Sequence, residues 1–247
     1  MLLKIQDIFL PQSRLTVLYF EGFFFNTFLP GSFGGDVVRA YRTSTQKLKS
    51  FVVIVVERGS GIFCLFLFVS VITVFFSNQI PDNIAAKPYL ALLSVLFTLF
   101  IFCTFFYLIF CGKFGQQQPD TLGLIRGRIY KFREALKIYR NHKGILLKVF
   151  LLSFLLQLNV VIHYFCIMKS LHIPVPIYFA FFAVPLIHFI LMLPISINGI
   201  GVRENSFVYM LSPVFSSSAT AIAVSWVAFA MVLFFALIGG CIHIFRK

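Results

Sequence analysis

Long apolar runs alternate with short polar segments along the chain, and the lengths of these runs predict its elements. A helix needs about 20 apolar residues to cross a bilayer. Four runs reach that length, and we expect each to be a full transmembrane helix: residues 51–77, 88–111, 145–168 and 219–245. The pattern therefore predicts an all-α polytopic membrane protein.

Two further apolar runs, residues 15–29 and 177–193, are too short to cross a bilayer comfortably. At the helical rise, the first would span only about 22 Å. Each run ends on a Leu that is followed by Pro. A turn that contains Ser and Gly comes next, and then another helix-compatible run begins. This order is typical of a helix that is broken inside the membrane. We predict two re-entrant hairpins, residues 15–45 and 177–213.

The turns of the two predicted hairpins resemble each other in sequence. Segments 29–39 (LPGSFGGDVVR) and 193–203 (LPISINGIGVR) share Leu, Pro, Ser, Gly, Val and Arg at corresponding positions. Paired broken helices in corresponding positions are a sequence indicator of a transporter's binding site. The alternative is that two ordinary interhelical loops acquired the same turn-forming residues.

The distribution of basic residues distinguishes between two topologies. If both hairpins are re-entrant from opposite faces, every Lys and Arg except Lys87, Lys169 and Arg203 lies on one side. If both short elements cross fully, the asymmetry is weaker, because both chain ends then join Lys87 and Lys169. The positive-inside rule favours the hairpins, with the basic loops in the cytoplasm. We therefore predict an inverted repeat within a single membrane domain, residues 1–247.

The composition agrees with a membrane location. Hydrophobic residues make up 60% of the chain and charged residues 12%, whereas a soluble domain has roughly 25% charged residues. The net charge of +13 is concentrated in loops, which marks the cytoplasmic face and argues against a nucleic-acid partner. Segment 121–142 alternates apolar and basic positions with helical spacing, so we expect an amphipathic helix at the cytoplasmic interface. It serves either as an anchor or in lipid-headgroup recognition.

The two turns contain residues suited to binding an anion. A glycine-rich turn followed by a helix start presents backbone N–H groups, and a guanidinium group holds a phosphate well. Asp36 would compete for those donors, and an N-cap role is the preferred interpretation for it. The predicted lipid- or anion-binding residues are Ser32, Gly34, Gly35, Arg39 and Arg42 in the first hairpin and Ser196, Asn198, Gly199 and Arg203 in the second.

Ionisable residues at membrane depth are costly, and they usually face a polar cavity or each other. Glu21 lies in the middle of an apolar run, and we expect Arg39 or Arg203 to be its partner. Glu57 and Arg58 either join such a cavity or lie at the water interface where their span starts. The predicted cavity ion pairs involve Glu21, Asp36, Glu57, Arg58 and Glu204.

Other polar residues carry weaker signals. Asn159 and His163 share a helix face, and His188 lies in the second hairpin. They line the cavity and relay protons, or they form hydrogen bonds between helices. No nucleophile–base arrangement, metal-ligand cluster or nucleotide-binding loop is visible in the sequence. We predict no catalytic residue, no metal and no cofactor.

Three sequence blocks resemble a known family. These are Asn26-x-x-Leu-Pro-Gly-x-x-Gly-Gly-Asp-Val-Val-Arg-Ala-Tyr, then Val-Glu57-Arg58, then Pro194-x-Ser-x-Asn-Gly-x-Gly-x-Arg-Glu204. Their order resembles the lysylphosphatidylglycerol synthase transmembrane region, also called the flippase-like family. The resemblance implies a prokaryotic inner-membrane protein that moves or presents lipids. It also implies spans before Asn26 and, in the synthases, a soluble catalytic domain after the membrane region. Neither is found in this sequence, so lysyl transfer is not expected.

These observations support one main functional hypothesis. The protein is expected to bind and translocate or present an anionic phospholipid or an isoprenoid-phosphate lipid, and not to be an enzyme itself. One alternative is a membrane enzyme or subunit for lipid-linked glycosyl or phospho transfer, which would need an acid or base such as Glu21 or Asp36. Another is a non-catalytic scaffold that holds a lipid-synthesis enzyme at the membrane.

Overall fold

The computed structural model describes residues 1–29, 34–44, 46–76, 87–111, 124–193, 195–196, 198–212, 214 and 217–245. All regular structure in this part of the chain is helical. Four of the described helices are long and apolar enough to cross a membrane: α4 (Lys47–Phe75), α5 (Lys87–Phe106), α7 (Lys143–Ser170) and α10 (Ser218–Phe245). A short π-helix, Tyr107–Cys111, continues α5. The predicted fold class, an all-α polytopic membrane protein with four full spans, is confirmed.

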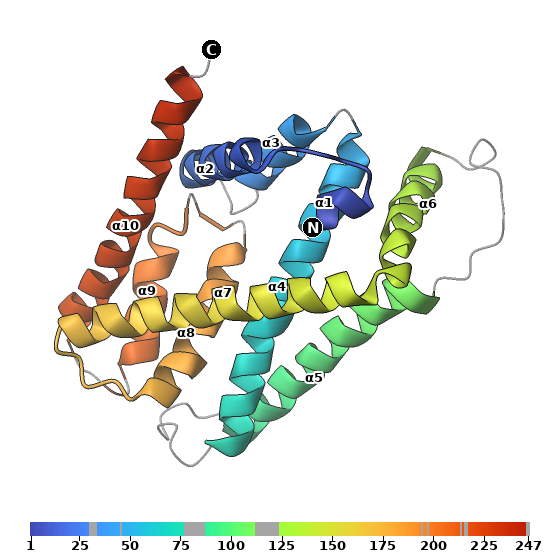
Figure 1. Ribbon diagram of the computed structural model, residues 1–247. Coiled ribbons are helices and arrows are strands. Elements are labelled where there is room, and N and C mark those ends of the chain that lie inside the picture. Colours follow the sequence, from blue (N-terminus) through green and yellow to red (C-terminus); the bar gives the residue numbers. More distant parts are fainter. Residues whose placement is uncertain are drawn as a thin grey trace.

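Helix α4 is the central element, and most other helices pack against it (Figure 1). Its most apolar window is 56% buried within the protein, whereas the corresponding window of α7 is only 11% buried. The exposed side chains of α7 are nonetheless large and apolar, for example Leu151, Leu155 and Leu156. Such a surface is stable only in a solvent that is itself apolar, because water would impose the hydrophobic penalty along the whole helix. The outer helices are therefore suited to contact lipid.

Two pairs of short helices lie on either side of the middle of α4. The first hairpin consists of α2 (Gln12–Phe28) and α3 (Gly34–Thr43), and the second consists of α8 (Ile177–Met192) and α9 (Val202–Leu211). Both α2 and α8 end in the same way. Leu29 and Leu193 adopt extended backbones, with ψ of 146° and 136°, because a proline that follows disfavours the helical conformation.

The two hairpins approach α4 from opposite ends. At the first end, Thr43 of α3 and Ser50 of α4 line one small cavity, and Asp36 at the start of α3 pairs with Arg58. At the other end, Tyr178 stacks on Phe76, and Phe189 contacts Phe66. Arg58 and Phe66 are roughly 15 Å from the respective ends of α4 at the helical rise. Asp36 of α3 and Phe189 of α8 therefore both contact the central part of α4, while α2 and α3 lie across its upper end in Figure 1.

The basic amphipathic segment folds as α6 (Leu124–Lys137) followed by a short 3₁₀ helix (Ile138–Asn141), while residues 121–123 lie outside the described part. It packs with α1 (Leu2–Ile5) and the first turns of α4 in one apolar cluster. The side-chain amide of Gln6 donates to the backbone oxygen of Ala135 at 2.8 Å. Burial raises the pKa of Tyr139 to about 12, so its hydroxyl stays neutral and donates to the backbone oxygen of Leu2. The N-terminal segment and α6 thus lie at the same end of α4.

Candidate functional site

The tip of the first hairpin is held by a close backbone contact. A Cβ added at Gly35 would lie 2.0 Å from the carbonyl oxygen of Gly22, so only glycine allows α2 and α3 to approach this closely. The backbone N–H of Gly35 donates to Oδ1 of Asn26 at 2.6 Å, which satisfies one of the free donors at the start of α3. A Cβ at Gly34 would meet Leu29 at 2.5 Å. Ser32 lies outside the described residues.

The charged residues of α3 face α4 and are paired there. Oδ2 of Asp36 accepts hydrogen bonds from Nε and Nη2 of Arg58, both at 2.6 Å. Arg39 pairs with Glu57 and lies 3.8 Å from Asp36. Asp36 is the third residue of α3 and lies inside the helix, so the expected N-cap role is not what the structure shows. Its carboxylate binds an arginine of the neighbouring helix instead.

An aromatic residue that the sequence analysis did not single out completes this network. The hydroxyl of Tyr19 donates to Oε1 of Glu57 at 2.7 Å, and the guanidinium of Arg39 lies 4.5 Å from the centre of the Tyr19 ring. These three side chains line a cavity of about 30 Å³, which is close to the volume of one water molecule. The cavity is far too small for a lipid headgroup.

Glu21 does not pair with either of its expected partners. Its Oε1 accepts from Nη1 of Arg42 at 2.8 Å and lies 3.2 Å from Nδ1 of His243. The expectation of Arg39 or Arg203 was therefore wrong. Arg39 is held by Glu57, and the last turn of α10 brings His243 to Glu21. His243 follows Glu21 by 222 residues, so nothing in the local sequence indicates this pair.

The turn of the second hairpin depends on left-handed backbone conformations. Asn198, Gly199 and Gly201 have φ angles of 49°, 76° and 81°, a region that glycine and asparagine adopt most readily. Glu204 caps its own helix, since its carboxylate accepts from the backbone N–H of Gly201 at 2.6 Å. The predicted role of Glu204 in a cavity ion pair has no counterpart in this arrangement. Ser196 lies on the same turn, half-buried.

Arg203 folds back over this turn. Its Nη2 donates to the backbone oxygen of Asn198 at 2.6 Å, and its guanidinium lies 4.9 Å from the centre of the Phe229 ring in α10. The residue is only 6% exposed. Arginine stays protonated even when it is buried, so a positive charge lies in the protein interior at this point.

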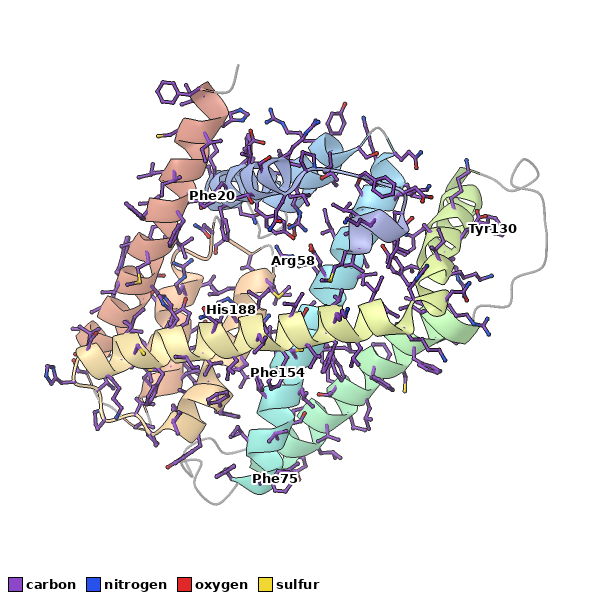
Figure 2. All side chains as sticks on the ribbon, viewed as in Figure 1. Phe20, Arg58, Phe75, Tyr130, Phe154 and His188 are labelled. Atoms are coloured by element: carbon purple, nitrogen blue, oxygen red, sulfur yellow. The ribbon has the colours of Figure 1, made fainter. Side chains whose placement is uncertain are left out.

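His188 lies on α8 of the second hairpin. In the view of Figure 2, Arg58 on α4 and His188 on α8 both lie below the first hairpin. The ring of Tyr164 from α7 lies 6.0 Å from His188 and stacks on Phe207 of α9.

The structure brings some predicted site residues together and separates others. Asp36, Arg39, Glu57 and Arg58 form one cluster, and Glu21 and Arg42 form a second with His243. Asn198, Gly199 and Arg203 lie together on the second turn. The sequence analysis did not assign site roles to Tyr19, Asn26, Tyr164 and His243. Asn26 carried a signal as the first residue of the family-like block, whereas the others carried none.

A comparison with family models decides the classification of the chain. The model described as "Lysylphosphatidylglycerol synthase TM region" matches residues 1–240 of the 247 residues. The chain belongs to this family. No curated protein and no solved structure shows a significant match. Family membership and the four long apolar helices together identify a multi-pass membrane protein of the lysylphosphatidylglycerol synthase transmembrane-region family, a family linked to lipid synthesis or flipping.

Proposed function

We propose that this protein of the lysylphosphatidylglycerol synthase transmembrane-region family binds an anionic, phosphate-bearing lipid and translocates or presents its headgroup within the membrane. The observation that supports this most is the arrangement of the two hairpins. Asp36 of the first hairpin and Phe189 of the second both contact the central part of α4. Charged residues gather where α3 meets α4. Opposed broken helices around a polar centre are a common design of secondary transporters.

In this proposal both hairpins are re-entrant, and each opens to a different face of the bilayer. A headgroup would enter from one face beside one hairpin and leave from the other beside its counterpart. The hairpins provide backbone and side-chain polarity at a depth where unpaired polar groups are expensive. The outer apolar helices keep the acyl chains of the lipid in the bilayer throughout.

The chemistry of the cluster favours lipid movement over an enzymatic reaction. The carboxylates of Glu21, Asp36 and Glu57 are each bound by an arginine. An acid–base catalyst must instead be able to exchange its proton with a substrate. We therefore propose transport or presentation of the lipid as the main function, and covalent chemistry on the lipid as the alternative.

A vesicle assay tests the proposal. The purified chain is reconstituted with fluorescent phosphatidylglycerol in both leaflets, and dithionite is added to quench the outer leaflet. We expect the protected half of the fluorescence to be lost at least tenfold faster than in protein-free vesicles. Lys148→Gln, which changes an exposed position near the start of α7, should leave the rate unchanged. Gly35→Leu should abolish the effect, because its side chain would collide with Gly22.

Two results would count against the proposal. The first is a rate in wild-type vesicles equal to that of protein-free vesicles. The second is the appearance of a covalently modified lipid by mass spectrometry in the same vesicles, which would support the enzymatic alternative.

A further inference from the structure

Arg203 is buried, and its electrostatic surroundings differ from those of Arg39, Arg42 and Arg58. In the part of the chain that the structure describes, the interior carboxylates are each matched with a cation: Glu21 with Arg42, Asp36 with Arg58, and Glu57 with Arg39. No carboxylate lies within ion-pair distance of Arg203 among these residues. A buried charge without a counter-charge is strongly unfavourable. Its presence therefore requires an explanation.

The contacts that Arg203 makes do not neutralise it. One guanidinium nitrogen, Nη2, donates to a backbone carbonyl, and the aromatic ring of Phe229 faces the group. Both contacts are favourable, but neither supplies a full negative charge. The Nε atom is buried and has no hydrogen-bond partner. Arg203 thus has an unused donor and an uncompensated charge.

Two more polar atoms without partners lie near Arg203. The side-chain amide nitrogen of Asn198, on the same turn, is buried and makes no hydrogen bond. Nδ1 of His188 on α8, in the same hairpin, is also buried and without a partner, and it donates or accepts according to the tautomer of the ring. Buried polar atoms in native proteins almost always have a partner. Two unused donors on one turn, Nε of Arg203 and the side-chain amide nitrogen of Asn198, indicate a ligand that accepts hydrogen bonds and carries negative charge.

Arg39, the residue of the first hairpin that is equivalent to Arg203, has different surroundings among the described residues. Aligning segments 29–39 and 193–203 places Asp36 of the first turn opposite Ile200 of the second. Arg39 lies 3.8 Å from Asp36 and pairs with Glu57 of α4, and it also faces the ring of Tyr19. Glu204, the carboxylate next to Arg203 in sequence, caps the backbone N–H of Gly201 instead of pairing with Arg203. Among the described residues, the two equivalent arginines therefore differ in whether a carboxylate lies within ion-pair distance.

We propose that the second turn is the anion site of the protein, with Arg203 and the side-chain amide of Asn198 holding the phosphate oxygens of a lipid headgroup and His188 lining the site. Arg39 of the first turn serves instead as a structural partner of Glu57. A guanidinium presents parallel donors that match two oxygens of a phosphate. This inference rests on the proposed function and assigns its ligand to one of the two turns.

Ligand-induced thermal stabilisation of the purified protein tests the assignment. Three probes are compared: dioctanoyl phosphatidylglycerol, inorganic phosphate, and dioctanoylglycerol, which lacks the phosphate. A ligand that binds only the folded state stabilises it by RT ln(1 + [L]/Kd), so at equal concentration the tighter ligand raises the melting temperature more. We expect stabilisation by the phospholipid and none by dioctanoylglycerol. Stronger stabilisation by inorganic phosphate at equal concentration would contradict the assignment of a lipid headgroup.

Two substitutions locate the site. Asn198→Asp keeps the size of the side chain and tolerates the positive φ, but it replaces the unused donor beside Arg203 with a carboxylate. Arg203→Gln removes the charge. Each should weaken phosphatidylglycerol binding by about 10- to 100-fold, which is the effect expected for a lost charge-assisted hydrogen bond. Gln12→Glu adds the same charge at an exposed position of α2, outside the second hairpin, and should change the dissociation constant less than threefold.

The ligand-free stability of the variants separates binding from folding. Asn198→Asp gives Arg203 a counter-charge, so its melting temperature without ligand should equal or exceed that of the wild type while binding is lost. Arg39→Lys should lower the ligand-free melting temperature and keep the dissociation constant within about threefold. Equal binding by wild type, Asn198→Asp and Arg203→Gln would overturn the inference.

The inference and the proposed function can fail separately. If the wild type binds phosphatidylglycerol through Arg203 but does not accelerate lipid movement in vesicles, the anion site stands and translocation is wrong. If vesicles show transport that Asn198→Asp and Arg203→Gln leave intact, translocation stands and the assignment of the site to the second turn is wrong.

Discussion

At the scale of single residues, the neighbours of each arginine, rather than its sequence motif, decide whether its charge is paired with a carboxylate. Arg39 and Arg203 occupy equivalent positions in two similar segments. Arg39 contacts two carboxylates, whereas Arg203 contacts a backbone oxygen and an aromatic ring. Residues that a sequence comparison treats as equal can therefore have different roles.

The ion pair between Asp36 and Arg58 should make a measurable contribution to stability. We expect Asp36→Asn to destabilise the protein by about 2 kcal/mol, less than the loss for a fully buried pair, because the Arg58 side chain is 32% exposed. Thermal unfolding in mild detergent measures the change. Asp7→Asn is the matched control, since Asp7 is exposed and its φ of 59° suits asparagine equally well. Equal melting temperatures for wild type and Asp36→Asn would show that the pair contributes nothing.

At the scale of elements, glycine determines how closely the helices approach each other. A Cβ at Gly239 of α10 would lie 2.0 Å from the backbone oxygen of Phe20 in α2. Gly35 makes the same kind of contact with Gly22. In membranes, where the hydrophobic effect does not drive helices together, such close backbone contacts supply much of the association energy. Helix α2 is thus held by glycines on both α3 and α10.

Alanine substitution should separate the packing role of glycine from its effect on helix propensity. Gly239→Ala inserts a methyl group against a backbone atom that cannot move away. We therefore expect the free energy of unfolding to fall by about 1–3 kcal/mol. Gly59→Ala on α4 meets only ordinary contact, with Phe105 at 3.5 Å. It should be neutral or stabilising, because alanine has the higher helix propensity. Both are compared by thermal unfolding, and equal effects at the two positions would refute the close-contact argument.

At the scale of the whole molecule, the N-terminal segment contacts the basic helix α6, and the end of α10 contacts the first hairpin. The N-terminal segment hydrogen-bonds to α6 through Gln6 and Ala135. The last turn of α10 contacts the first hairpin through His243 and Glu21. These contacts agree with hairpins that do not cross the membrane, because two full crossings would put both chain ends on the face opposite to α6.

Cysteine labelling in intact cells tests this topology. Single cysteines replace the exposed residues Gln12, Arg140 and His172 in a background without native cysteines. We expect a membrane-impermeant maleimide to label His172→Cys from outside, and Gln12→Cys and Arg140→Cys only after the cells are permeabilised. Labelling of Gln12→Cys together with His172→Cys from outside would mean that the first short element crosses completely.

The local sequence was sufficient to predict the helical elements and the points at which they break. Length and apolarity predict the four long helices, and Leu29 and Leu193 end their helices because proline follows each of them. Three sequence blocks also led to the family, which the match over residues 1–240 shows. All of these signals act over a few residues, so they can be read without knowing the fold.

Only the tertiary structure decided which charges meet. Glu21 binds Arg42 and His243 rather than the arginines expected from the sequence, because α10 packs on α2 and brings together residues that are 222 positions apart. The helices that pack against each turn likewise decide whether its arginine has a carboxylate nearby. Arg39 has one, whereas Arg203 has none within ion-pair distance among the described residues. Electrostatic energy falls with distance in space, and the sequence records distance only along the chain.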